Sequence, residues 1–115
     1  QIIGSAIEVH KSLGPGLLES VYQACMEREL ELRGIHYERQ KVLPVEYKGV
    51  LVDCGYRLDL FVENKVVVEL KCVEAIIPIH AAHLLTYLKL VNVKVGLIIN
   101  FHVEVIKDGF KRRVL

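Results

Sequence analysis

Residues 56–72 read YRLDLFVENKVVVELKC, and this stretch decides the fold because it contains two strands and the turn between them. Apolar and polar residues alternate before the turn, and the run after it is rich in valine, as is typical of β-strands. A slip of one residue in the pairing would turn every side chain to the other face. If residues 63–65 form the turn, the register that matches the apolar faces places Asp59 directly opposite Glu69.

The same register gathers charged side chains on one face of the hairpin, namely Arg57, Asp59, Glu69 and Lys71. The opposite, apolar face of the first strand is expected to carry Tyr56, Leu58, Leu60 and Val62. Carboxylates on paired strands lie about 5 Å apart and repel each other unless a cation, a shared proton or a lysine relieves them. Ion pairs on a solvated strand face are the simpler interpretation. However, charges inside the apolar run VVVELK are costly unless they are used, and oxygens in this pattern suit Mg²⁺ or Mn²⁺.

The residues around this hairpin predict three helices and several further strands. The predicted helices cover residues 3–13, about 17–33 and 78–91, and the first two pack as an αα-hairpin. The inner stripe of the second helix is expected to hold Leu18, Val21, Tyr22, Cys25, Met26 and Leu30. Further strands are predicted at 42–47, 50–54 and 93–100, with an edge hairpin formed by 103–106 and 110–115. This order predicts an α/β sandwich around a mixed sheet, with residues 1–115 forming one domain.

Composition limits the class of protein. The 115 residues are 52% hydrophobic and 25% charged, which excludes disorder. The net charge of +1 gives no global attraction to nucleic acid, so a polyanion site must be a local patch. Cys25, Cys54 and Cys72 form no CxxC pair, and their odd number predicts reduced thiols in a cytoplasmic protein. No apolar run reaches the roughly 18 to 20 residues that cross a bilayer, so no membrane partner is expected.

Two motifs resemble those of a known family. Asp59, with Glu69-Leu70-Lys71 after it, resembles the D…(D/E)xK signature of the PD-(D/E)XK nuclease superfamily. Upstream, residues 16–22 (GLLESVY) are similar to the G-x-x-E-x-x-Y motif of the GxxExxY protein family, a branch of that superfamily. The resemblance covers residues from about 3 to 100 and implies a restriction-endonuclease-like αβ sandwich, a central mixed sheet flanked by helices. Gly16 is expected to let the helix start approach the sheet closely.

The resemblance also implies a role for each site residue. Asp59, Glu69 and the main-chain carbonyl of Leu70 would ligate Mg²⁺ or Mn²⁺. Lys71 would position or help deprotonate the attacking water and stabilise charge on the phosphate. Glu19 would complete the site through a bound water or as a further ligand.

Three aromatic or imidazole side chains are auxiliary candidates. Tyr22 follows Glu19 by one helical turn and faces the same way, although it could equally be a core tyrosine packed on the sheet. His83 stands four residues before Tyr87, where related proteins usually have glutamine, and is expected to take over a polar contact with phosphate or a metal-bound water. His80 and His83 have one-face spacing, but zinc binding is disfavoured because no third ligand is near. An ordinary helix face is the remaining interpretation.

The leading hypothesis is a divalent-metal-dependent nuclease, a hydrolase of phosphodiester bonds in DNA or RNA. The rival is a catalytically silent module of the same fold that mediates dimerisation or binds a partner. A third possibility is an enzyme acting on small nucleotides or RNA ends. A chain of this size has little surface for recognition, which favours a homodimer. Residues 111–113 (KRR), and Arg39 with Lys41, could contact phosphates, although a solvated tail and strand edge are the simpler interpretation.

Overall fold

A computed structural model describes the backbone of residues 1–115 and every side chain except that of Cys54. Its elements, in chain order, are α1 (Ile2–Leu13), α2 (Glu19–Leu32), β1 (Tyr37–Tyr47), β2 (Val50–Val62), β3 (Val66–Lys71), α3 (Pro78–Val91), β4 (Val95–Asn100), the 3₁₀ helix η1 (Ile106–Gly109) and β5 (Phe110–Val114). Among the described residues, none of the helices combines the length and apolar character that a membrane span requires.

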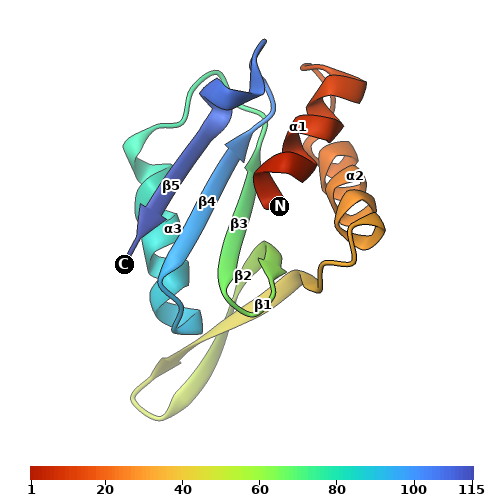
Figure 1. The fold of residues 1–115 in the computed structure, drawn as a ribbon. Helices are drawn as coiled ribbons and strands as arrows, with labels where there is room; N and C mark the ends of the chain where they lie inside the picture. The colour runs from red at the N-terminus through yellow and green to blue at the C-terminus, as the bar shows by residue number, and fades with distance from the viewer.

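The five strands form one mixed sheet in the order β1-β2-β3-β4-β5. Only β3 and β4 pair in parallel, and α3 makes the crossover between them. The sheet lies between two helical layers, with α1 and α2 on one face and α3 on the other (Figure 1). The α/β sandwich with a mixed sheet is therefore confirmed. Beyond the short part of β2 that pairs with β3, β1 and β2 pair only with each other and form a two-stranded arm (Figure 1).

Each face of the sheet has its own apolar core. The core under α1 and α2 is built around fully buried side chains that include Tyr22, Met26, Leu30, Leu60, Val68, Leu70 and Ile99. The core under α3 contains Leu43, Leu58, Phe61, Val67, Leu84, Leu88 and Ile98. β4 contributes alternate side chains to both cores, which explains why residues 95–100 are almost uninterruptedly apolar. Leu84 packs so closely on Gly96 that a Cβ atom added to Gly96 would lie 2.7 Å from Leu84 Cδ1.

The predicted edge hairpin is wrong in its first half. Residues 103–106 do not form a strand, and β5 pairs antiparallel with β4 instead. The segment before η1 is held against α1, since the His10 ring nitrogen Nε2 lies 2.7 Å from the carbonyl oxygen of Val103. Ile106 then enters the core under α1 and α2. Packing of this segment on the core thus replaces strand pairing.

Details of the α1–α2 connection also differ from expectation. α2 begins at Glu19, and Leu18 is its extended N-cap, so Leu18 is 73% exposed and does not belong to the inner stripe. Val21 is also exposed. Gly16 does not mediate close approach, because nothing lies within 4 Å of the position of a Cβ, whereas its φ of +96° favours glycine. Cys25 and Cys72 are free, half-buried thiols, and the side chain of Cys54 lies outside the described residues.

Candidate functional site

The β2–β3 hairpin has the predicted register but stops one residue short of the acidic pair. The ladder pairs Val62 with Val66, Phe61 with Val67, and Leu60 with Val68. Beyond it, side-chain contacts replace pairing: the Leu70 N–H donates to Asp59 Oδ2 at 2.7 Å, and the Asp59 N–H lies 3.4 Å from Glu69 Oε1. The two carboxyl groups that the sequence predicts to be opposite each other are therefore neighbours at the point where the strands separate.

A distortion on the other side of β2 accompanies this separation. The β1–β2 ladder omits the pair Gln40 and Asp59, and Gln40 has a φ of +46°. Leu58 packs in the core under α3, whereas Leu60 packs in the core under α1 and α2. The prediction that these two leucines share a face is wrong, because β2 turns over at Asp59. Asp59 thus occupies the point where the strand changes face.

Burial and the nearby Asp59 carboxylate raise the pKa values of two acidic groups at the site. Glu69 is only 8% exposed, and burial, with the adjacent Asp59 carboxylate as the second cause, raises its pKa to about 9. Burial and then Asp59 also raise the pKa of Glu19, while the Lys71 ammonium opposes both shifts. Glu19, Asp59, Glu69 and Lys71 therefore interact electrostatically, although they come from α2, β2 and β3.

α2 supplies one wall of a groove at this site. The groove has a volume of about 410 Å³ and is lined by Glu19, Ser20, Gln23, Ala24, Glu27, Arg39, Gln40 and Asp59. The Gln23 amide donates to the Asp59 carbonyl oxygen and to Glu27 Oε2, both at 2.9 Å, which ties α2 to the distorted part of β2. We did not predict a role for Gln23, although its position four residues after Glu19 on the same helical face is a usable signal.

α3 approaches the site from the other layer. The Ile77 N–H donates to His80 Nδ1 at 3.2 Å, so the imidazole holds the first turn of the helix. Burial, then the Lys71 and His83 charges, lowers the pKa of His80. A neutral ring with Nδ1 as acceptor carries its proton on Nε2 and can donate there. His80 is thus the imidazole near Lys71.

Asn100 fixes the chain that follows Lys71. It is 2% exposed and pairs with Lys71 in the parallel ladder between β3 and β4. Its Oδ1 accepts the N–H groups of Val73 and His102, both at 3.1 Å, and its amide donates to the Val73 carbonyl oxygen at 2.8 Å. Sequence reasoning missed this residue. The signal in the sequence that could have identified Asn100 is an isolated amide side chain at the end of an apolar strand, beside the loop that follows the neighbouring strand β3.

The auxiliary candidates lie farther from the carboxylates. Tyr22 is fully buried, stacks on Phe101 with ring centroids 4.4 Å apart, and donates its hydroxyl hydrogen to the carbonyl oxygen of Gly14. Its position is that of a core tyrosine which fastens the α1–α2 loop. His83 is exposed and lies against Tyr87, with ring centroids 6.5 Å apart. Tyr87 also contacts Tyr56 of β2. These rings line the α3 side of the β1–β2 arm.

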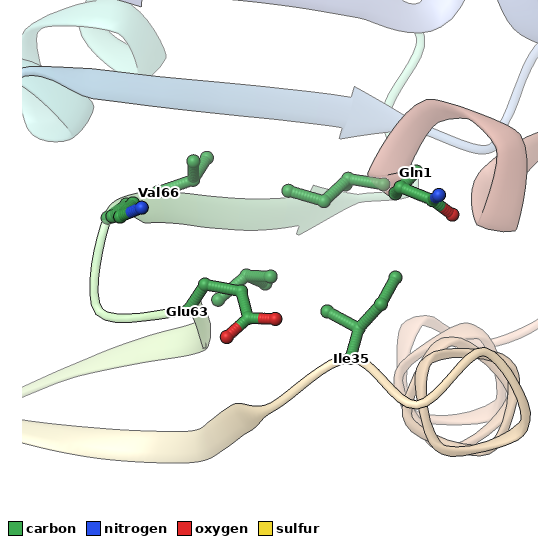
Figure 2. Close-up of a pocket in the computed structure, with 7 residues that line it drawn as sticks. Gln1, Ile35, Glu63 and Val66 are labelled. Atoms are coloured by element: carbon green, nitrogen blue, oxygen red, sulfur yellow. The ribbon is translucent and has the colours of Figure 1, made fainter.

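A larger cavity lies elsewhere and lacks comparable chemistry. Its volume is about 530 Å³, and its lining residues are Gln1, Ile2, Ile35, Val62, Glu63, Lys65 and Val66. Figure 2 shows Glu63 and Val66 at the hairpin turn, with Gln1 and Ile35 across from them. This cavity borders the start of β3, whereas Lys71 lies at its end. Size alone therefore does not locate the candidate site.

The donors at the acidic site suit a hard cation. Asp59 and Glu69 offer only oxygen atoms as ligands. The pKa of Glu69 is raised partly by the Asp59 carboxylate, so a positive charge bound between the two groups would be stabilised. Within the described part of the chain, no three His, Cys, Asp or Glu side chains converge as a metal cage. Two carboxylates and a main-chain carbonyl would leave water to complete the ligand set, as Mg²⁺ usually retains. The residues therefore fit Mg²⁺ or Mn²⁺ better than zinc.

Comparisons with known proteins agree with this arrangement. No curated protein and no solved structure matches the chain. A family model does match: that of the PD-(D/E)XK nuclease superfamily, over residues 1–113. The mixed sheet with helices on both faces is consistent with the restriction-endonuclease-like fold of that superfamily. With nearly the whole sequence covered, this chain belongs to the PD-(D/E)XK nuclease superfamily.

Proposed function

We propose that this chain is a divalent-metal-dependent nuclease that hydrolyses phosphodiester bonds in DNA or RNA. One observation carries the proposal: Asp59, Glu69, Lys71 and Glu19 interact where β2 and β3 separate. Superfamily membership supports a nucleic acid substrate and a divalent metal ion. The buried position of Glu69 argues against a merely solvated strand face, because an unused buried acid is costly.

Asp59 and Glu69, with the carbonyl of Leu70, would hold Mg²⁺ or Mn²⁺. The bound ion would supply positive charge to the phosphate and favour ionisation of the attacking water. The Leu70 N–H fixes the orientation of the Asp59 carboxylate by donating to Oδ2. Lys71 would orient the water and stabilise negative charge that develops on the phosphate. Glu19, whose raised pKa makes it a better proton acceptor than an ordinary glutamate, would accept a hydrogen bond from that water.

Auxiliary roles follow from position. His83 and Tyr87 would contact the substrate outside the metal ligands, whereas Tyr22 would act only through the loop that precedes Glu19. The match of residues 16–22 to G-x-x-E-x-x-Y supports assignment to the GxxExxY branch. We also propose a single domain over residues 1–115, a homodimer and a cytoplasmic location. Free thiols at Cys25 and Cys72 support the location.

A cleavage assay tests the nuclease proposal directly. Labelled single-stranded, double-stranded and branched DNA and RNA are incubated with Mg²⁺ or Mn²⁺ and the protein. We expect cleavage by the parent protein and its loss in Lys71→Ala and Asp59→Asn, both shown to be folded by circular dichroism. Lys65→Ala, a change in the exposed turn of the same hairpin, is the matched control and should cleave normally.

Three outcomes contradict the proposal. Cleavage that survives both substitutions would indicate a contaminant or another site. Absence of both cleavage and metal binding by calorimetry would favour the catalytically silent module that binds a partner. Cleavage confined to small nucleotides, added to the panel as further substrates, or to RNA ends would favour a processing enzyme. Asp59→Asn is preferred to alanine because asparagine retains an oxygen that can accept the Leu70 N–H.

A further inference from the structure

We propose that the phosphate backbone of the substrate lies across the α3 side of the sheet, between Lys71 and a basic pair, Lys111 and Arg113, on β5. The inference rests on the proposed nuclease function and deepens it by giving the substrate a path. The sequence alone favours a solvated tail for residues 111–113, and the fold supplies the reason to treat two of these three residues differently.

The strand register places the basic pair on the same face of the sheet as Glu69 and Lys71. Glu69 pairs with Ile98 on β4, and Ile98 pairs with Lys111 on β5, so these three residues form one row across the sheet. Ile98 belongs to the core under α3, which identifies the face. Two strand spacings separate Lys111 from Glu69, or about 10 Å. Because Ile98 is fully buried under α3, a single strand would pass around the start of α3 and would need at least three nucleotides, at about 3.4 Å each, to span this distance.

A cavity lies where the pair meets α3. It has a volume of about 230 Å³ and is lined by Ile76, Ile77, Pro78, Ala81, Lys111 and Arg113. None of the described residues that line it is acidic. Within the described part of the chain, neither Lys111 nor Arg113 makes an ion pair with a carboxylate. The two charges are therefore not neutralised by the protein, and a polyanion such as a phosphate backbone is the chemically matched occupant.

The start of α3 connects the lining of this cavity with the surroundings of Lys71. Ile77 lines the cavity and donates its N–H to His80, and His80 lies close enough to Lys71 for the ammonium to lower its pKa. Lys71, His80 and the basic pair thus follow one another along this edge of α3. A phosphate bound between Lys111 and Arg113 would belong to the same strand as one at Lys71.

The groove on the α2 side offers a poor alternative path. Glu19, Glu27 and Asp59 line it. Arg39 is the one basic residue among its described lining residues, and it forms an ion pair with Glu27, with Nε and Oε1 3.0 Å apart. A phosphate backbone in that groove would meet repulsion on both sides. The two sides of the site therefore differ in charge, and the sign of the difference favours the α3 side.

Arg112 provides a matched control within the same strand. It pairs with Leu97, which belongs to the core under α1 and α2, and it lines a different cavity with Gln1 and Ile2. Arg112 and Arg113 are therefore adjacent in sequence and equal in charge but lie on opposite faces. A general attraction between phosphate and a basic tail would use both, whereas the proposed path uses only Arg113.

The test measures binding of fluorescein-labelled single-stranded DNA and RNA of one sequence. Fluorescence anisotropy gives the binding constant K in EDTA at KCl concentrations from 50 to 200 mM. Losing two phosphate contacts should reduce the slope of log K against log salt by about 1.4, since each contact on a single strand contributes about 0.7. We expect this reduction in the double variant that carries Lys111→Gln and Arg113→Gln. The same double variant should bind at least tenfold more weakly at 50 mM KCl. Arg112→Gln should behave as the parent protein. Glutamine retains much of the aliphatic stem, so packing is preserved.

Equal effects of the double substitution and of Arg112→Gln would overturn the inference, as would failure of the parent protein to bind either probe. The cleavage assay distinguishes failure of the substrate path from failure of the proposed nuclease function. Cleavage that requires Lys71 but is indifferent to the basic pair would leave the nuclease and remove the path. Salt-dependent binding through the basic pair without cleavage would leave the path and remove the nuclease.

Discussion

Replacement of Glu69 by glutamine should increase the stability of the protein relative to wild type, and this advantage should grow as the pH rises. Glu69 has a pKa of about 9 in the folded chain against an ordinary 4.5, so the folded state retains a proton that the unfolded state loses. Between these values, the free energy of unfolding of the wild type falls as the pH rises. Below about pH 4.5 both states are protonated and the effect vanishes. Glutamine resembles the protonated carboxyl group and does not titrate, so the variant escapes this loss.

The size of the effect follows from the shift. Each pH unit between the two pKa values costs about 1.4 kcal/mol, so the cost at pH 7 is about 3 kcal/mol relative to pH 4.5. The pKa of Glu19 is also raised, which adds a loss of the same sign to both proteins. From about pH 5 to pH 8, the stability of Glu69→Gln relative to wild type should therefore increase by about 4 kcal/mol. That is a large part of the stability of a small domain.

Urea unfolding at pH 5, 6, 7 and 8, followed by circular dichroism, measures this difference. Glu63→Gln, in the exposed turn of the same hairpin, controls for the loss of any glutamate and should parallel the wild type. Mg²⁺ at ten times its Kd should restore about 1.4 kcal/mol to the wild type and less to Glu69→Gln. A stability difference between Glu69→Gln and wild type that is the same at pH 5 and pH 8 would show that Glu69 does not retain a proton in the folded state.

Three further substitutions test the framework of the site by the same unfolding measurement. Tyr22→Phe should cost about 1–3 kcal/mol, because the Gly14 carbonyl loses a donor while the stacked ring remains; no loss would contradict the loop-fastening role. Gly96→Ala should cost about 1–3 kcal/mol, since its Cβ would displace Leu84 and with it α3; an unchanged free energy of unfolding would contradict the close packing. Asn100→Ala should cost about 3 kcal/mol for three hydrogen bonds and should also slow cleavage by loosening the chain after Lys71; normal cleavage would remove that positioning role.

The parts of the fold that depend on local pattern could be predicted from the sequence. The bounds of α3 follow from Pro78 at its first position and from apolar spacing, and the sequence prediction gives the same bounds. The β2–β3 register follows from matching apolar faces across a three-residue turn. The edge hairpin was mispredicted because residues 103–106 satisfy a strand pattern locally, whereas contact with α1 decides their conformation. A tertiary contact of this kind leaves no periodic signal.

The candidate site was predictable as a set of charged residues but not as a geometry. Alternation along a strand predicts that Leu58 and Leu60 share a face. This pattern contains no information about the positive φ of Gln40 on the neighbouring strand. The contributions of Gln23 and Asn100 were missed because each depends on a partner far along the chain, at Asp59 and Val73. Periodicity indicates which way a side chain faces within its own helix or strand. It does not indicate which residues of other elements contact that side chain.

The interrupted ladder at Asp59 explains how residues from the two sides of the sheet can meet. In a regular sheet, side chains alternate between faces, so a glutamate on α2 and a lysine on the α3 side of β3 would be separated by the backbone of the sheet. Asp59 lies where β2 changes face and where pairing with β3 ends. Its carbonyl oxygen accepts the Gln23 amide from α2, while its carboxylate accepts the Leu70 N–H from β3, next to Lys71. The interruption of the β2–β3 ladder costs pairing energy, and it is therefore the feature that lets Glu19 and Lys71 interact across the sheet. Among the described residues, this proposed site has an acidic wall on the α2 side and, on the α3 side, basic groups that make no ion pair.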